Sequence, residues 1–410
     1  MRRLNFSAAL ALALIAAPCL PAEDWPGWLG PRRDGTSTET IAPWETAPTV
    51  LWRAAVAEAH SSPVVAGGLV VLHTRVPGQN AENLTARDAR TGKVVWSVES
   101  PRDPFENSFG AGPRATPAIS GNRIVSYGVT GVLVCRDLKT GKELWKADTL
   151  KQFAATNLYF GVSSSPLIDG DHVFVMVGGK QAGLVCFSMA DGTVVWKAVD
   201  ERASYSSPVL AGEGSNRRLI ALTQAGVVAL DPATGKLDWR YPLVDRLNES
   251  STTPIILKNS LMAASVTYGA VGLKPASGKP EVIWKNGALT CYFSTPVPTA
   301  SGSEILLVSG RLLPPPSSIL RCVDSATGKE LWNQPAVGKY HAALMRLSDG
   351  RFLMHDDTGN IRLFEATRSE FRELAKSRIC GPTWAHPALS QGVLYIRDDK
   401  ELLALQVRQP

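Results

Sequence analysis

The 410-residue chain carries 43 Lys and Arg against 37 Asp and Glu, a formal net charge of +6, and 44% of its residues are hydrophobic. This composition is typical of a globular protein, and the 35 Gly and 28 Pro indicate many turns. The positive excess is mild and dispersed, with no run of basic residues, so we expect no nucleic-acid partner.

The N-terminus predicts a secretory signal peptide over residues 1–22. A basic start, Arg2-Arg3, precedes the apolar run 6–17, and residues 20–22 offer a cleavage site for signal peptidase. No later stretch has eighteen consecutive apolar residues, so we expect no transmembrane segment and a periplasmic or secreted location. Attachment of a lipid at Cys19 is the alternative.

An extension over residues 23–48 leads to a repeated line of sequence, D-x-x-T-G-K-x-x-W. The copies run over Asp88–Trp96, Asp137–Trp145, Asp231–Trp239 and Asp324–Trp332, with weaker ones over Ser188–Trp196 and Lys274–Trp284. Upstream of each copy lies a Ser/Thr-rich step into proline, of which Ser61-Ser62-Pro63 is the first. Short β-branched runs bounded by Gly, Asp and Asn predict four strands in each unit of about 45 residues. Such units are typical of β-propeller blades.

Each part of the repeat has a local structural role. The Asp carboxylate is suited to capping turn amides, and the Gly supplies the positive φ that closes a tight hairpin. The Trp is expected to fill the layer between blades, with its indole N–H on a backbone carbonyl. We assign this blade-docking role to Trp52, Trp96, Trp145, Trp196, Trp239, Trp284 and Trp332.

The number of blades follows from the two ends of the repeat array. A degenerate seventh unit has Ala343 in place of proline and Leu374 in place of tryptophan. The eighth unit starts at residue 385 and reaches Val407 with only three strands, and the strand at 49–53 supplies the fourth. We therefore predict an all-β fold over residues 49–407, an eight-bladed β-propeller of four-stranded antiparallel blades closed by N-terminal strand pairing with the last blade. Seven blades is the alternative, with the degenerate unit acting as a cap.

The cysteine positions favour buried thiols over a disulfide framework. Cys135, Cys186 and Cys322 occupy one equivalent strand position in separate blades, too far apart to bridge. Cys291 and Cys380 both precede an inner strand and form the one plausible pair. The chain has no C-x-x-C and no His/Cys spacing suited to zinc, so we predict no metal-ligating residues.

The T-G-K-x-x-W repeats with Ser/Thr-Pro inner strands resemble the tryptophan-docking propellers of the pyrroloquinoline quinone (PQQ) repeat superfamily, over residues 49–407. In length and layout the chain is closest to small cofactor-free members, such as the propeller lipoprotein of the outer-membrane β-barrel assembly machinery. Residues 24–35 also resemble the W-P-x-x-x-G-P-x-R-D-G opening of many exported PQQ-repeat proteins. In the dehydrogenases of the superfamily, the resemblance would imply PQQ over calcium, a catalytic Asp, and often a vicinal disulfide. This chain has no Cys-Cys pair and no recognisable calcium-binding trio.

The inner strand of each propeller blade starts at the mouth of the central channel. The position three before the proline reads, blade by blade, His60, Arg114, Ser163, Tyr205, Ser251, Phe293, Tyr340 and Trp384. His341 and His386 lie one or two residues further in. Such side chains suit stacking on, and hydrogen bonding to, a polar or planar ligand, although they also serve simply to fill a channel. The residues that we predict to bind a ligand or partner are His60, Arg114, Tyr205, Phe293, Tyr340, His341, Trp384 and His386.

Three long insertions, at 99–113, 150–162 and 311–317, are predicted to reach this same face, where loops commonly carry function. The nearby carboxylates Asp103, Glu106 and Glu249 show no catalytic spacing, and we expect them to be solvated loop charges.

We predict no catalytic residues, because the sequence holds no G-x-S-x-G, Walker or H-E-x-x-H pattern. The leading hypothesis is an exported, monomeric, non-catalytic propeller without a cofactor, which binds an envelope protein or an extended polymer ligand on its loop-bearing face. The first alternative is a PQQ-dependent alcohol or sugar dehydrogenase, with PQQ and calcium as cofactors. The second is a carbohydrate-binding accessory protein.

Overall fold

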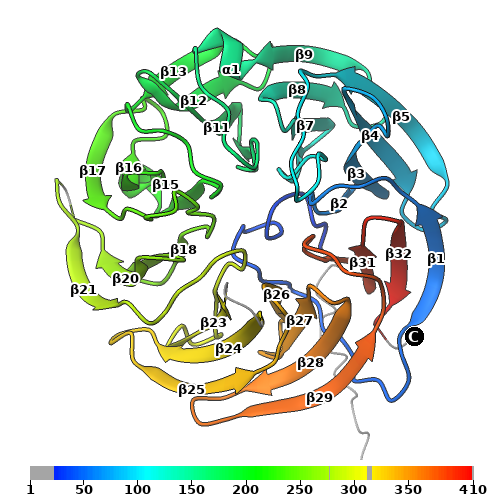
Figure 1. Cartoon of the computed structure of the whole chain (residues 1–410), viewed down its shortest axis with the longest axis vertical. Helices are drawn as coiled ribbons and strands as arrows, with labels where there is room; N and C mark the ends of the chain where they lie inside the picture. Colours follow the sequence, from blue (N-terminus) through cyan, green and yellow to red (C-terminus); the bar gives the residue numbers. More distant parts are fainter. Residues whose placement is uncertain (1–22, 277, 312–315, 409–410) are drawn as a thin grey trace, which may run out of the picture.

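Eight four-stranded antiparallel sheets stand around a central channel as the blades of a propeller (Figure 1). The computed structural model describes residues 23–276, 278–311 and 316–408. The predicted signal peptide over 1–22, with Cys19, lies outside these residues. In seven of the sheets the strands follow chain order from the channel outward, which confirms the prediction of an eight-bladed all-β propeller.

The strands of the first four blades are β2 (Val64–Ala66), β3 (Leu69–Arg75), β4 (Ala81–Asp88) and β5 (Val94–Pro101); β6 (Ala118–Ser120), β7 (Arg123–Tyr127), β8 (Val132–Asp137) and β9 (Glu143–Asp148); β10 (Leu167–Asp169), β11 (His172–Gly179), β12 (Ala182–Ser188) and β13 (Val194–Ala198); and β14 (Val209–Ala211), β15 (Arg218–Leu222), β16 (Gly226–Leu230) and β17 (Leu237–Pro242). Blades five to seven consist of β18 (Ile255–Ile256), β19 (Leu261–Ser265), β20 (Gly269–Lys274) and β21 (Glu281–Asn286); β22 (Val297–Pro298), β23 (Glu304–Arg311), β24 (Ser317–Asp324) and β25 (Glu330–Pro335); and β26 (Ala342–Arg346), β27 (Phe352–Asp356), β28 (Asn360–Ala366) and β29 (Phe371–Arg378). Short helical turns, α1 (Thr149–Gln152) and η1 (Gly214–Asn216), lie between strands.

The eighth blade is built from both ends of the chain. It contains β30 (Ala388–Ser390), β31 (Val393–Arg397) and β32 (Glu401–Gln406), and β1 (Thr49–Ala55) is its outermost strand. β1 pairs with β32 antiparallel, with Thr49 opposite Gln406 and Ala55 opposite Glu401. Figure 1 shows this blue strand beside the red one. The predicted closure is therefore confirmed, and it covers the strand edge that β32 would otherwise expose.

The repeated Trp and Gly meet across each boundary between blades. The indole N–H of Trp96 donates to the Leu138 carbonyl at 2.8 Å, in the turn of the following blade. In the same turn Gly141 has φ +73, and a Cβ there would lie 2.8 Å from the Trp96 ring. This Gly is therefore required both by the backbone and by the ring that packs on it. The same relation joins Trp52 to Gly92, Trp145 to Gly192, Trp196 to Gly235 and Trp284 to Gly328.

The remaining two repeated tryptophans lie in equivalent layers. Trp332 donates to the Thr367 carbonyl at 2.9 Å, and Trp239 is buried among residues of blades four and five. The Asp of the motif organises the turn on which the indole docks, since Asp88 Oδ1 accepts from both the backbone N–H and the hydroxyl of Thr91, each at 2.7 Å. The apolar core is correspondingly divided into layers between neighbouring blades.

The Ser/Thr before each proline links the inner strands of adjacent blades. Thr116 Oγ1 accepts the backbone N–H of Ser62 at 3.2 Å, and Ser165 Oγ accepts that of Thr116 at 2.9 Å. The ring continues from Ser165 N to Ser207 Oγ, and His386 N donates to Ser62 Oγ where the first and last blades meet, both at 2.9 Å. These hydroxyls satisfy buried N–H groups that the short inner strands leave unpaired.

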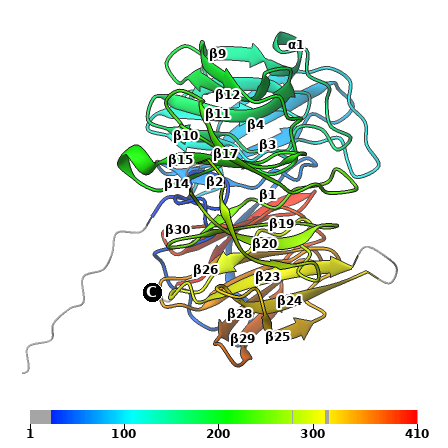
Figure 2. The ribbon, with the colours of Figure 1, turned by 90° about the vertical axis from the view of Figure 1, so that its left-hand side faces the viewer.

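The N-terminal extension crosses the channel along the inner strands, from the Ser/Thr-Pro steps to the far ends of these strands. Its backbone or side chains bond to blades one, two, three, seven and eight. These bonds join Trp25 to Val65, Pro26 to Ile119, Arg33 to Pro166, Ser37 to Arg346 and Ala42 to Val407. In Figure 1 the blue segment runs through the centre of the ring, and Figure 2 shows it on one side of the disc. The extension is therefore a plug, residues 24–42, that closes one end of the channel.

Cys291 and Cys380, the one plausible pair in the sequence, do not form a disulfide. All five cysteines of the described residues are buried free thiols. Cys291 belongs to an apolar layer with Ile305 of blade six, whereas Cys380 packs with the layer of blades seven and eight. Both cysteines precede an inner strand, but they lie in different layers of the ring. Among the described residues, no helix has the length and apolar character needed to cross a membrane.

Candidate binding pocket at the channel mouth

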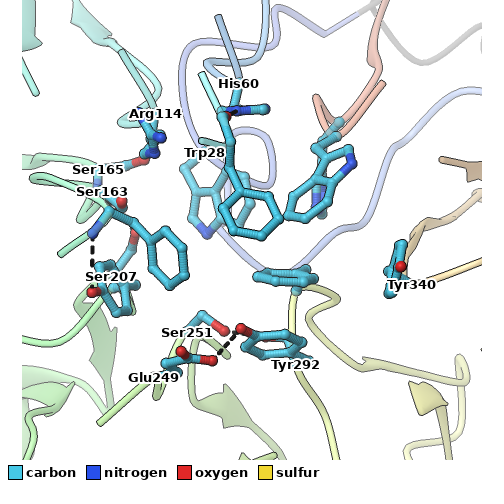
Figure 3. A pocket seen from close by; sticks show the side chains of 16 residues that line it. Trp28, His60, Arg114, Ser163, Ser165, Ser207, Glu249, Ser251, Tyr292 and Tyr340 are labelled. Carbon is cyan, nitrogen blue, oxygen red and sulfur yellow. Dashed lines mark hydrogen bonds between the residues drawn. The ribbon is translucent and has the colours of Figure 1, made fainter. Parts of the chain in front are cut away.

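The channel opens at the Ser/Thr-Pro end into a cavity of about 340 Å³ (Figure 3). All eight positions of the predicted ring line it. The lining consists of Trp28, His60, Phe109, Arg114, Phe160, Ser163, Ser165, Tyr205, Ser207, Glu249, Ser251, Tyr292, Phe293, Tyr340, Trp384 and His386. Lining side chains from the repeat lie three residues and one residue before the prolines, because alternate residues of an extended strand face the same side.

This alternation separates the two histidines that we predicted together. His386 stands one residue before Pro387 and lines the pocket. His341 corresponds to Ser61 of the first blade, two positions before proline, and it lies outside the lining. It is 1% exposed, and its Nδ1 lies 2.9 Å from the Ser294 hydroxyl. Its role in this structure is therefore to pack between blades six and seven.

Aromatic side chains form one wall of the pocket around Trp384. Its ring centroid lies 4.4 Å from that of Phe293, 5.6 Å from that of His60, and 6.3 Å from those of Tyr340 and Phe109. The sequence had predicted four of these five residues from the repeat register. Phe109 lies in the insertion between the first two blades, outside that register.

The second aromatic residue that the register missed is Phe160, in the insertion that starts at α1. Its ring lies 5.6 Å from that of Phe109 and 5.4 Å from that of Tyr205. The two insertions also bond to each other, since Asn107 Nδ2 donates to the Tyr159 carbonyl at 2.9 Å. The predicted loop-bearing face thus supplies part of the pocket itself. The sequence signal that could have identified these two pocket residues was the presence of aromatic residues inside each insertion.

Polar groups form a second wall, which adjoins the aromatic wall where the Tyr292 ring lies 3.5 Å from that of Phe293 between centroids. The Tyr292 hydroxyl donates to the Glu249 carboxylate, and the Ser251 hydroxyl donates to the Tyr292 carbonyl (Figure 3). Burial, followed by the negative charge of Glu249, raises the pKa of Tyr292, so its hydroxyl remains a donor. Glu249 is therefore a pocket residue held by a specific donor, which corrects the expectation of a solvated loop charge. The Ser207 hydroxyl belongs to the same wall.

The basic side chains of the pocket have partners or are neutral. Arg114 donates to the Gly112 and Gly110 carbonyls at 2.7 and 2.8 Å, which holds the first insertion. Burial lowers its pKa to about 10, so it stays protonated at neutral pH. His60 Nε2 lies 2.7 Å from the Phe109 carbonyl, and burial together with Arg114 lowers the pKa of His60 to about 4. This imidazole is therefore neutral at physiological pH.

Trp28 of the plug forms the floor of the pocket. Its indole N–H donates to the Thr253 hydroxyl at 2.9 Å, and its ring centroid lies 4.5 Å from that of His386. His386 is 5% exposed, and its Nε2 has no hydrogen-bond partner among the described residues. Burial lowers the pKa of His386 well below its usual value, so the ring is neutral. Repeat reasoning missed Trp28 because it precedes the first repeat.

A family comparison agrees with this fold. The family described as outer membrane protein assembly factor BamB, built of PQQ-type repeats, matches residues 36–106 and 80–334. The chain belongs to this PQQ-repeat propeller family. No curated protein sequence matches the chain.

Solved structures share the fold of this family at low sequence identity. BamB from Moraxella catarrhalis is 16% identical, covers 89% of this chain and 99% of its own, and has a TM-score of 0.60. The quinohemoprotein alcohol dehydrogenase from Comamonas testosteroni is 12% identical, with 94% and 81% coverage and a TM-score of 0.67. A europium-containing methanol dehydrogenase is 13% identical, with 93% and 89% coverage and a TM-score of 0.65. Proteins with this fold therefore include an assembly factor and enzymes. The fold alone does not indicate the function of this chain, so the residues of the pocket have to be considered.

Proposed function

We propose that the chain is an exported, non-catalytic propeller that binds an envelope protein or an extended ligand at its channel mouth. The observation that carries the proposal is the pocket around Trp384, which combines an aromatic wall with the two longest inter-blade insertions. Exposed aromatic anchors surrounded by polar groups are the usual centre of a binding site. The basic and apolar leader and the family of an outer membrane assembly factor support a periplasmic or secreted location.

The pocket does not fit PQQ held over a calcium ion. Calcium takes about six to eight oxygen ligands, with carboxylates prominent among them. The described pocket lining has a single carboxylate, Glu249, which accepts from Tyr292. No group of three His, Cys, Asp or Glu in the described part of the chain is placed to hold a metal ion. A polyanionic quinone would also need cations, and the one guanidinium, Arg114, is engaged by backbone carbonyls.

Affinity capture from envelope extract tests the binding function. The wild-type protein should retain specific material, protein or polymer, which Phe293→Ala and Tyr340→Ala lose by at least about tenfold. Val95→Ala is the control, because this valine is 51% exposed on the outer strand β5 and does not line the pocket. Equal capture by all four proteins, or no specific capture by the wild type, would refute the proposal.

A titration with PQQ and calcium tests the enzymatic alternative. The purified protein should show no bound quinone absorbance and no dye reduction in the presence of alcohols or sugars. Stoichiometric quinone binding with substrate-dependent dye reduction would show that the protein is a dehydrogenase and would refute the proposed binding function.

A further inference from the structure

The pocket is amphiphilic from one wall to the other. Figure 3 places Ser163, Ser207, Ser251 and Glu249 on one side and Tyr340 on the opposite side. Tyr340 belongs to the aromatic wall around Trp384. A ligand that fills this space needs an apolar face for the rings and hydroxyl or amide groups for the polar wall. A sugar ring has both, since its C–H faces stack on aromatic rings and its hydroxyls lie at the rim.

The charges of the pocket favour an uncharged ligand. The guanidinium of Arg114 is held by two carbonyls, and the carboxylate of Glu249 is held by the Tyr292 hydroxyl. The imidazoles of His60 and His386 are neutral at physiological pH. Arg114 and Glu249 give the lining one positive and one negative charge, so the pocket offers an ionic ligand no net counter-charge in return for the hydration that the ligand loses.

The floor of the pocket restricts how a polymer enters. Trp28 and the plug close the channel, so a chain is unable to thread through the ring. The His386 ring at the floor is buried beneath Trp28, with 4.5 Å between the ring centroids, so a ligand that enters the pocket meets the Trp28 indole at its deep end. The cavity of about 340 Å³ has room for a terminal unit and excludes a long segment.

We propose that this pocket binds the terminal ring of a neutral carbohydrate chain, with the ring between the Trp384 wall and Glu249 and with its end toward Trp28. The proposal rests on the binding function above and names the ligand of the same site. An aromatic side chain of a partner protein would stack equally well on Trp384. It has at most one polar group to offer the Glu249 carboxylate and the O–H groups of Ser165 and Ser207, whose oxygens accept backbone N–H groups, whereas a sugar ring has several hydroxyls.

The test is calorimetry with linear neutral oligosaccharides of glucose (α-1,4 and β-1,4), mannose, xylose and N-acetylglucosamine. One series should bind with a dissociation constant between about 10 μM and 10 mM. Its affinity should stop rising beyond about two units, because only the end of the chain enters a closed pocket. Affinity that keeps rising along the series would indicate an open groove and would overturn end recognition.

Substitutions in the two walls test whether the ligand binds between them. Trp384→Ala and the nearly isosteric Glu249→Gln should each weaken binding by at least about tenfold. Val95→Ala, on the outer strand β5, should bind as the wild type does. The thermal unfolding midpoint of each variant shows whether it is folded. If Trp384→Ala does not fold, the affinity of Glu249→Gln alone tests whether the sugar binds in this pocket. If Glu249→Gln binds the oligosaccharide as tightly as the wild type does, the sugar does not bind in this pocket and the proposal is wrong.

N-acetyltryptophanamide is the competing probe. Binding of this compound, with none of the oligosaccharides bound at up to about 10 mM, would assign the pocket to an aromatic side chain and overturn the proposal. If neither probe binds while envelope capture still depends on Phe293, the carbohydrate inference alone fails. If capture is also independent of Phe293, the proposed binding function fails with it.

Discussion

The indole N–H of Trp28 donates a hydrogen bond to the hydroxyl of Thr253 at 2.9 Å, although 225 residues separate the two in the chain. Through this bond the N-terminal plug reaches the fifth blade, in addition to its bonds with blades one, two, three, seven and eight. One residue therefore links the closure of the channel to the floor of the pocket.

Trp28→Ala should lower the free energy of unfolding by about 2 kcal/mol, less than for a fully buried aromatic residue because Trp28 is half-buried. Trp28→Phe keeps a ring at the floor and loses the hydrogen bond, at a cost of about 1 kcal/mol. Urea unfolding followed by circular dichroism measures both. If the alanine variant is as stable as the wild type, the plug does not contribute to the stability of the ring.

Gly141→Ala should destabilise the fold by about 2 kcal/mol more than Gly121→Ala. Both glycines have positive φ, at +73 and +55, so either substitution strains the backbone by about 1–2 kcal/mol. Only at Gly141 would the new Cβ also meet the Trp96 ring, at 2.8 Å, whereas nothing lies within 4 Å at Gly121. Equal losses in the thermal midpoints of the two variants would show that the ring does not select this glycine.

Thr116→Val should cost about 1–3 kcal/mol, because the buried N–H of Ser62 then loses its acceptor at 3.2 Å. Thr116→Ser keeps the hydroxyl and is the control. Hydrogen exchange at the Ser62 amide gives a local readout, with faster exchange in the valine variant and a rate close to wild type in the serine variant. Unchanged protection in both would show that this link between blades one and two is dispensable.

The free energy of unfolding should fall as the pH drops from about 6.5 toward 4. Burial lowers the pKa values of His60 and His355 to about 4 and that of His341 to about 3. The unfolded chain therefore binds protons in this window while the native protein does not. Each such histidine contributes a slope of up to about 1.4 kcal/mol per pH unit.

His355→Gln provides the check on this pH dependence. Urea unfolding at pH 7 and pH 5 should show a smaller stability difference in the variant than in the wild type. Replacement of the exposed Tyr159 should leave the difference unchanged. An identical pH dependence in wild type and His355→Gln would mean that His355 is not held neutral by the fold.

The repeat alone determined the architecture of this protein. Hairpin turns and strand alternation are local properties, so Asp88, Gly92 and Trp96 already specify a blade and its docking layer. The strand at residues 49–53 was recognisable as the missing fourth strand because the last unit is one strand short. Counting three residues back from each proline also located the ring at the channel mouth.

Only the tertiary structure decided which residues complete the pocket. Phe109, Phe160 and Trp28 lie outside the repeat register, and they reach the channel because the ring brings distant segments together. Cys291 and Cys380 both precede an inner strand, yet they lie in different layers of the ring and remain free thiols. A periodic sequence specifies contacts that recur in every blade, whereas the contacts at the axis depend on how all eight blades and the plug converge.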